Sequence, residues 1–284
     1  MLLVKILKPF VEMFPIIANF YRFVRDTRAT ETKVLFRDKL GFFFNGNDAM
    51  QNGNFEPIET LIIEQLLKKF DIFINIGANT GYYVCKSLSK GKNTIAFEPN
   101  NLNVIFLLKN IRANKFKTDF QFFPVALSDE VGVLPMYGAS TGASLIKGWA
   151  GQKGASLVPI STFDKIASSL IKRKKCLVLI DIEGAEFKCL KGAKSLLSSN
   201  EDNVFLIEVS VTDHQPEGIK INPNLVKTFK LMKSFGYNAY TANTELRKIE
   251  ISEIVDIKNS NINTLETSNF IFVKSKQILK SIEF

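Results

Sequence analysis

The chain has 284 residues, of which 46% are hydrophobic and 23% are charged, a composition typical of a globular protein. This length suits one large domain with extensions or at most two small domains, and we expect a single core. The composition and the lack of a long low-complexity tract exclude a chain that is disordered throughout.

The charge balance is basic, with 37 Lys and Arg residues against 28 Asp and Glu residues, a formal charge of +9. Such a charge favours an anionic partner, such as a phosphorylated substrate, a nucleic acid or an acidic membrane, unless the lysines merely form a solvated surface. The basic residues are scattered except for the short run from Lys172 to Lys175. Because this run directly precedes an apolar segment, we expect a solvated helix end there rather than a binding patch.

Three cysteines and one histidine offer little for metal binding. Cys85, Cys176 and Cys189 lie inside apolar patterns and form no CxxC pair. We therefore expect neither a disulfide framework nor a metal site. Isolated cysteines of this kind are typical of a reducing compartment, which predicts a cytoplasmic protein.

Apolar residues recur at helical spacing between Leu2 and Val24, which predicts an amphipathic helix within an N-terminal extension of residues 1–55. Charged residues such as Lys5, Lys8 and Glu12 interrupt the pattern, so this helix cannot span a bilayer. It either packs on the following domain or makes a peripheral contact with a membrane or a partner. Because its polar face carries few cations, we favour packing on the domain.

From residue 56 onward, strand-like and helix-like patterns alternate. Strands are predicted over residues 72–76, 94–97, 120–127, 157–160, 176–182, 204–209, 237–241 and 270–273, with a hairpin arm over 133–137. Helices are predicted over residues 56–70, 101–114, 162–174, 186–199 and 224–235, with another directly after Gly81. Residues 138–154 are rich in Gly, Ala and Ser and predict a long flexible loop. The alternation predicts an α/β fold with a mostly parallel sheet of about seven strands, flanked by helices on both faces.

The residues after the first two strands indicate a nucleoside-containing cofactor. In an open α/β sheet, ligands bind beyond the carboxyl ends of the strands, and Gly77 and Gly81 flank the first turn there. Glu98 ends the second strand about 20 residues later, the usual place for a carboxylate that accepts hydrogen bonds from ribose hydroxyls. Tyr82 stands where a dinucleotide motif requires glycine, and Asn79 suits an amino-acid group better than a pyrophosphate.

A second group of chemically active residues follows the strand predicted over 176–182. Asp181, Glu183 and Glu186 lie close together in the sequence at the predicted ligand edge of the sheet. Glu186 is explained by the preference of a helix N-terminus for negative charge. Asp181 and Glu183 are not explained in this way, so we interpret them as functional.

Several of these segments together resemble the motifs of FkbM-type methyltransferases. The matching segments, in the family's order, are residues 75–83, 97–100, 125–129, 162–164 and 180–186, followed by 207–208 and 235–237. The similarity extends from about residue 56 to residue 273, which assigns residues 56–284 to an FkbM-like domain. One departure is Asn75, where the family often has Asp.

The resemblance implies a Rossmann-like class I methyltransferase fold, S-adenosylmethionine as the methyl donor, and a hydroxyl of a carbohydrate or small metabolite as the acceptor. It implies that Gly77, Asn79 and Gly81 hold the methionine part and that Glu98 binds the ribose. Ala126 and Leu127 would then border the adenine, and Asp181 would face the methyl-transfer centre. The other residues of the implied cofactor site are Ile76, Ala78, Pro99 and Asn100.

Methyl transfer to a hydroxyl benefits from a base, and the candidates are Asp181, Glu183 and His214. His214 is the only histidine and follows the fifth core strand, where an acceptor could bind, although an ordinary loop histidine would look the same. Trp149, the only tryptophan, lies in the loop predicted over 138–154. It either stacks on an acceptor sugar as part of a lid or anchors the loop on the domain.

Other functions remain open from the sequence. The charge of +9 permits an RNA methyltransferase, although no RNA-binding module or base-methylation motif is present, and we expect no DNA partner. A non-catalytic binding protein built on a cofactor fold is a further alternative. Basic residues around the cofactor pocket would favour RNA.

Overall fold

The computed structural model describes residues 35–37, 40–138, 142–152 and 154–284. The amphipathic helix predicted between Leu2 and Val24 lies outside these residues. In the part of the chain that the structure describes, no helix is long and apolar enough to cross a membrane.

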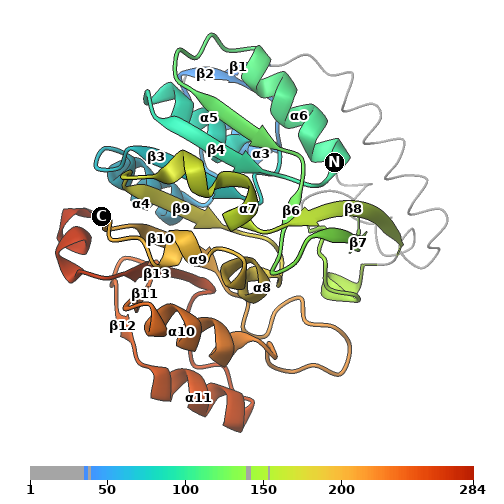
Figure 1. The fold of residues 1–284 in the computed structure, drawn as a ribbon, viewed down its shortest axis with the longest axis vertical. Coiled ribbons are helices and arrows are strands. Elements are labelled where there is room, and N and C mark those ends of the chain that lie inside the picture. The colour runs from blue at the N-terminus through green and yellow to red at the C-terminus, as the bar shows by residue number, and fades with distance from the viewer. Residues whose placement is uncertain (1–34, 38–39, 139–141, 153) are drawn as a thin grey trace.

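An eight-stranded sheet forms the centre of the molecule, in the order β12-β11-β13-β10-β9-β3-β4-β5 (Figure 1). Its strands are β3 (Ile72–Ile76), β4 (Asn93–Phe97), β5 (Phe120–Phe123), β9 (Cys176–Ile180), β10 (Val204–Glu208), β11 (Asn238–Thr241), β12 (Lys248–Ile249) and β13 (Asn269–Val273). The five strands from β10 to β5 are parallel, whereas β13 runs antiparallel to β10 and β11. The predicted α/β fold with a mostly parallel sheet is confirmed, with one short edge strand, β12, more than expected.

The central strands are apolar on both sides, as a sheet covered on two faces requires. Successive side chains of a strand point to opposite faces. Ile72, Ile74 and Ile76 of β3 therefore pack in one core, and Phe73 packs in the other. The strands β9 and β10 alternate in the same way.

Helices cover both faces of the sheet (Figure 1). One face is covered by α7 (Phe163–Ala167), the 3-10 turn η2 (Ser168–Ile171), α8 (Glu186–Lys191), α9 (Lys194–Leu197), α10 (Leu225–Ser234) and α11 (Ile251–Ser260). The other face is covered by α4 (Pro57–Leu67), α5 (Tyr82–Ser89) and η3 (Lys276–Ser281), with α6 (Asn101–Arg112) packed against α5.

Two predicted helices are each broken in the structure. Residues 162–174 form α7 and the 3-10 turn η2, and residues 186–199 form α8 and α9. The second break lies at Gly192, where an added Cβ would be 2.0 Å from the carbonyl oxygen of Ser128. The chain passes so close to its neighbour there that only glycine fits.

A small second sheet, in the order β6-β8-β7, lies beside the main one (Figure 1). Its strands are β6 (Ala126–Leu127), β7 (Gly132–Tyr137) and β8 (Ala155–Ser161). The predicted hairpin arm is thus β7, which pairs with β8. The single strand predicted over 120–127 is wrong, because β5 and β6 belong to different sheets. Pro124 lies between them, and proline cannot donate a ladder hydrogen bond.

The described part of the predicted N-terminal extension is not helical throughout. It contains the antiparallel pair β1 (Leu35–Arg37) and β2 (Phe42–Phe44), followed by the short helix α3 (Asp48–Gln51). Phe42, Phe44 and Met50 are buried in the same core as α4 and α5. The boundary at residue 55 stays a prediction.

Asn110 of α6 ties this segment to the first turn of the main sheet. Its side chain is completely buried. The amide Nδ2 donates to the carbonyl oxygens of Asn45 and Thr80, each at 2.9 Å, and Oδ1 accepts from the Asn45 N–H at 2.8 Å. One buried side chain therefore holds two segments that are distant in the sequence.

Candidate cofactor and acceptor site

A cavity lies at the carboxyl ends of β3, β4 and β9 and encloses about 600 Å³, part of it open to solvent. Most of the residues predicted for the site line it: Ile76, Gly77, Asn79, Glu98, Pro99, Ala126, Leu127, Asp181 and Glu183. Residues at the ends of β3, β4 and β9, together with β6 of the small sheet, therefore converge where the topology of an open α/β sheet places a ligand.

Four predicted residues do not line this cavity. Ala78 is buried in a core with α5, and Gly81 is the N-cap residue of that helix. Asn100 caps α6, its side chain accepting from the N–H groups of Leu102 and Asn103. His214 lies farther out, with 54% of its side chain exposed.

Glu98 is held in a fixed orientation by the chain itself. Its Oε2 accepts from the Asn79 N–H at 2.7 Å, and its Oε1 accepts from the Asn100 N–H at 2.8 Å and from Asn103 Nδ2 at 3.3 Å. Burial raises the pKa of this carboxyl above its ordinary value, although the hydrogen bonds partly oppose the rise. A carboxylate offers about four acceptor positions, so one on Oε2 remains for a hydroxyl such as that of a ribose.

The two glycines of the turn are required by the protein's own packing. Gly77 has φ +88°, and an added Cβ would lie 1.9 Å from the Asp181 carbonyl oxygen. Gly81 has φ +89°, and its added Cβ would lie 3.1 Å from the Leu107 side chain. The close approach at Gly77 is therefore to the end of β9, which fixes the distance between the first turn and Asp181.

Two asparagines shape the same turn. Asn79 adopts φ +50°, a conformation that asparagine tolerates better than most residues, and its Oδ1 accepts from the Thr80 N–H at 2.8 Å. Asn75 is 1% exposed, and among the described residues its Oδ1 has no hydrogen-bond partner. An unpartnered oxygen of a neutral amide costs less to bury than an unpartnered carboxylate oxygen would.

Acidic side chains gather at the ends of β9 and β10. Ile180 and Ile207 are ladder partners, so Asp181 and Glu208 follow them on adjacent strands. Burial raises the pKa of Asp181 well above its ordinary value, and Glu208 and Glu183 raise it further. Burial, with Glu183, raises the pKa of Glu208 to about 7. Both carboxyls therefore resist ionisation more than an isolated carboxyl does.

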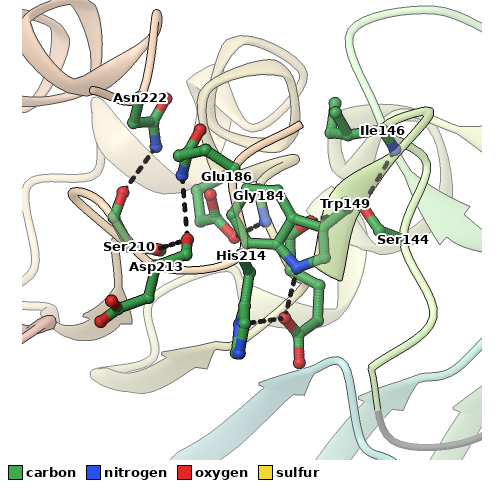
Figure 2. Close-up of polar contacts among 11 residues, drawn as sticks. Ser144, Ile146, Trp149, Gly184, Glu186, Ser210, Asp213, His214 and Asn222 are labelled. Carbon is green, nitrogen blue, oxygen red and sulfur yellow. Dashed lines mark hydrogen bonds and ion pairs between the residues drawn. The ribbon is translucent and has the colours of Figure 1, made fainter. Parts of the chain in front are cut away.

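Trp149 connects the loop predicted over 138–154 to the acidic end of β9 (Figure 2). It is 2% exposed, and its Nε1 donates to Glu183 Oε2 at 2.7 Å. Ser144 Oγ donates to the Glu183 carbonyl oxygen at 2.5 Å. The ring lies so close to Gly184 that an added Cβ there would be 2.6 Å from it. The structure therefore supports the anchoring role of Trp149.

His214 lies against the same tryptophan (Figure 2). The two ring centroids are 6.0 Å apart, and the Ala150 N–H donates to the His214 carbonyl oxygen at 2.8 Å. His214 Nδ1 is 3.7 Å from Glu183 Oε2. Glu183 therefore faces both Trp149 and His214, at the edge of the cavity that is open to solvent.

Comparison with known proteins identifies the chain. The family model of the methyltransferase FkbM domain matches residues 75–239, which is more than half of the chain. The chain belongs to the FkbM methyltransferase family. A search among curated proteins finds no match.

Solved structures of methyltransferases are similar to the chain at low identity. Monomeric WbdD has 10% identity and a TM-score of 0.37, with 77% of this chain and 40% of that chain covered. The magnesium protoporphyrin IX methyltransferase ChlM of Synechocystis PCC 6803, with bound SAM, has 8% identity and a TM-score of 0.41, with 89% and 91% covered. The precorrin-6y C5,15-methyltransferase of Geobacter metallireducens has 12% identity and a TM-score of 0.38, with 84% and 97% covered. The family membership rests on the family model.

S-adenosylmethionine is the cofactor of this FkbM methyltransferase, and the chemistry of the cavity fits it. Glu98 offers an oriented carboxylate for a ribose hydroxyl, and apolar side chains such as Leu127 and Met136 border the space beside it. When bound, the cofactor supplies a methyl group on a positively charged sulfur. Glu183 adds an acidic side chain to the neighbouring wall, which suits such a cation.

Further residues line the cavity that the sequence motifs did not single out for binding: Phe97, Asn103, Val125, Met136, Ala143, Leu145, Ile182 and Ala185. Phe97, Val125, Ile182 and Ala185 lie within the matching segments, so position alone could have suggested them. Met136, Ala143 and Leu145 come from β7 and the loop after it, which no motif marks. Among the described residues, no group of three or more His, Cys, Asp or Glu side chains is arranged to hold a metal ion.

Proposed function

We propose that this FkbM methyltransferase methylates an oxygen atom, a hydroxyl of a carbohydrate or small metabolite. The observation that carries the proposal is the pair Asp181 and Glu208 at the ends of adjacent strands, with Asp181 lining the cofactor cavity. A hydroxyl that accepts a methyl group must lose its proton. A carboxyl whose pKa is raised above its ordinary value is a stronger base than an ordinary carboxylate and is better matched to take that proton.

Two arrangements of the base follow from the geometry. Asp181 lies in the cavity wall and would serve a hydroxyl that enters the cavity. His214, more than half exposed and facing Glu183, would serve a hydroxyl held at the open edge, where Glu183 could orient the ring. In either case the new bond joins the methyl carbon to the acceptor oxygen, the carbon–sulfur bond breaks, and the proton passes to the base.

The charge of the cavity favours a neutral acceptor over RNA. Its lining contains the acidic residues Glu98, Asp181 and Glu183, and no lysine or arginine is among the described residues that line it. A polyanionic acceptor would need basic residues at the site to offset its phosphates. The excess of positive charge in this chain lies elsewhere.

The test is a transfer assay with S-adenosylmethionine carrying a labelled methyl group and a panel of sugars, glycosides and hydroxylated metabolites. We expect label on an oxygen of at least one acceptor, with RNA as a parallel arm. The variant Asp181→Asn should reduce transfer while cofactor binding persists, and His214→Ala should do so if the base is at the open edge. Cofactor binding without transfer to any hydroxyl would favour the non-catalytic alternative, and label on RNA would contradict the proposed acceptor.

A further inference from the structure

A second cavity lies at the opposite end of the strands from the cofactor cavity, where β3, β9 and β10 begin and β13 ends. It encloses about 750 Å³, part of it open to solvent. Its lining residues are Lys69, Phe70, Lys175, Asp202, Asn203, Val204, Val273, Lys274, Ser275, Gln277 and Ile278. We call it the lysine cavity, after Lys69, Lys175 and Lys274. It is separate from the cofactor cavity, which lies beyond the carboxyl ends of the same strands.

The positive charge of the lysine cavity is only partly balanced. In the described part of the chain, no carboxylate forms an ion pair with Lys69 or Lys175. Lys274 Nζ donates to a neutral partner, the Ser199 carbonyl oxygen, at 2.6 Å. Asp202 is the acidic member of the lining. Like charges that share a concave surface raise the local potential and attract a counter-ion.

Tyr237 provides a second observation beside this cavity. It is 1% exposed, and its hydroxyl has no hydrogen-bond partner among the described residues. Lys274 Nζ lies 5.1 Å from the centroid of its ring. Burial raises the pKa of the hydroxyl, and Cys176 and Asp202 add to the rise. A buried hydroxyl without a partner is uncommon and costly.

The basic run from Lys172 to Lys175 ends at the same cavity. All four residues of the run are exposed, as expected of a solvated segment, and Lys175 also lines the cavity. The run therefore adds positive potential at the mouth of the cavity. Part of the chain's excess positive charge therefore lies beside this cavity.

We propose that the lysine cavity binds a phosphate-bearing ligand. Three lysines from separate segments line this one cavity, and lysine binds phosphate as a compact point charge. The apolar residues Phe70, Val273 and Ile278 give the cavity a surface for the non-phosphate part of the ligand. The proposal concerns a site distinct from the methyl-transfer site and does not depend on the acceptor of the methyl group.

The first test is calorimetric titration of the full chain with inorganic pyrophosphate. The double variant Lys69→Gln/Lys175→Gln should bind it about tenfold more weakly. The matched control is Lys227→Gln/Lys230→Gln, which removes the same charge from exposed positions on α10 and should bind as the wild type does. Added salt should weaken wild-type binding. Among the described residues no carboxylate forms an ion pair with any of these four lysines, and melting temperatures should confirm that both variants fold.

Vesicles distinguish a lipid headgroup from a soluble ligand. Vesicles of phosphatidylglycerol that bind the wild type and the control, but not the Lys69→Gln/Lys175→Gln variant, would assign the phosphate to a lipid. Binding of pyrophosphate without binding of vesicles would assign it to a soluble ligand. Failure of the wild type to bind either probe, or equal binding by the wild type and both variants, would overturn the proposal.

Discussion

Trp149 and Glu183 are joined by a hydrogen bond of 2.7 Å between the indole Nε1 and a carboxylate oxygen, although they lie in different loops. The same oxygen faces His214 at 3.7 Å. The tryptophan therefore sets where the negative charge of Glu183 lies relative to the imidazole. This hydrogen bond, together with the one that Ser144 Oγ donates to the Glu183 carbonyl oxygen, holds a loop rich in small residues against the end of β9.

Replacing this tryptophan by phenylalanine tests the bond separately from the packing. Trp149→Phe keeps an aromatic ring against Gly184 but removes the donor to Glu183. We expect the free energy of unfolding to fall by about 1–2 kcal/mol, because a hydrogen bond to a charged group is lost. Urea denaturation measures the change. In a double-mutant cycle with Glu183→Gln, purely additive effects would contradict the coupling of the two side chains.

The turn glycine Gly77 should tolerate no side chain. Gly77→Ala would place Cβ 1.9 Å from a backbone oxygen, and we expect a loss of more than about 3 kcal/mol or failure to fold. Gly91→Ala is the matched control, since Gly91 has φ +75° and nothing within 4 Å of the added Cβ. That variant should lose only the cost of the left-handed conformation, about 1–2 kcal/mol. Similar melting temperatures for the two variants would show that the contact with Asp181 does not matter.

Glu98 should be necessary for cofactor binding. S-adenosylmethionine at 100 times its dissociation constant should stabilise the wild type by about 2.7 kcal/mol, seen as a rise in melting temperature. Glu98→Gln keeps the shape but replaces one acceptor oxygen by an NH2 group. That group would face the N–H of Asn79 or of Asn100, so the rise should be largely lost. Glu283→Gln, far along the chain and exposed, serves as the control, and retained stabilisation in Glu98→Gln would remove Glu98 from the site.

Burial of Glu186 should make stability depend on pH. Its pKa is raised to about 7, mainly by burial, from an ordinary value of about 4.5. The folded state therefore holds the proton more tightly, so this contribution to stability is complete below about pH 4.5 and is lost as pH rises to about 7. Glu186→Gln should reduce the decline across this range by an amount on the order of 2–3 kcal/mol. Denaturation curves of the wild type and the variant at pH 4.5, 6 and 7.5 measure it, and parallel declines would refute the assignment.

The sequence predicted those elements whose residues carry a clear hydrophobic pattern of their own. Buried strands such as β3 and β9 have continuous apolar runs, and Glu98 follows its strand at the expected distance. The helix α11 was missed although Ile251, Ile254 and Ile257 recur at helical spacing. The pair β1 and β2 was missed because a three-residue strand has too few positions to show a period.

The features that could not be predicted depend on contacts between distant residues. Position 77 requires glycine because the Asp181 carbonyl oxygen lies where a Cβ would be, and the sequence around Gly77 does not reveal this contact. Trp149 could equally be a lid or an anchor until its partner was known. Glu208 belonged to a recognised motif, but only the pairing of β9 with β10 places it beside Asp181.

Asn110 has a consequence for how the chain responds to its cofactor. Because its buried amide bonds to both Asn45 and Thr80, residues 42–51 and the first turn cannot open independently without leaving polar groups unpaired. Whatever steadies the turn must also slow the local opening of the segment before it. Amide hydrogen exchange at Asn45, a residue outside the cofactor cavity, should therefore slow when that cavity is filled, and this one backbone N–H would serve as a natural reporter of occupancy.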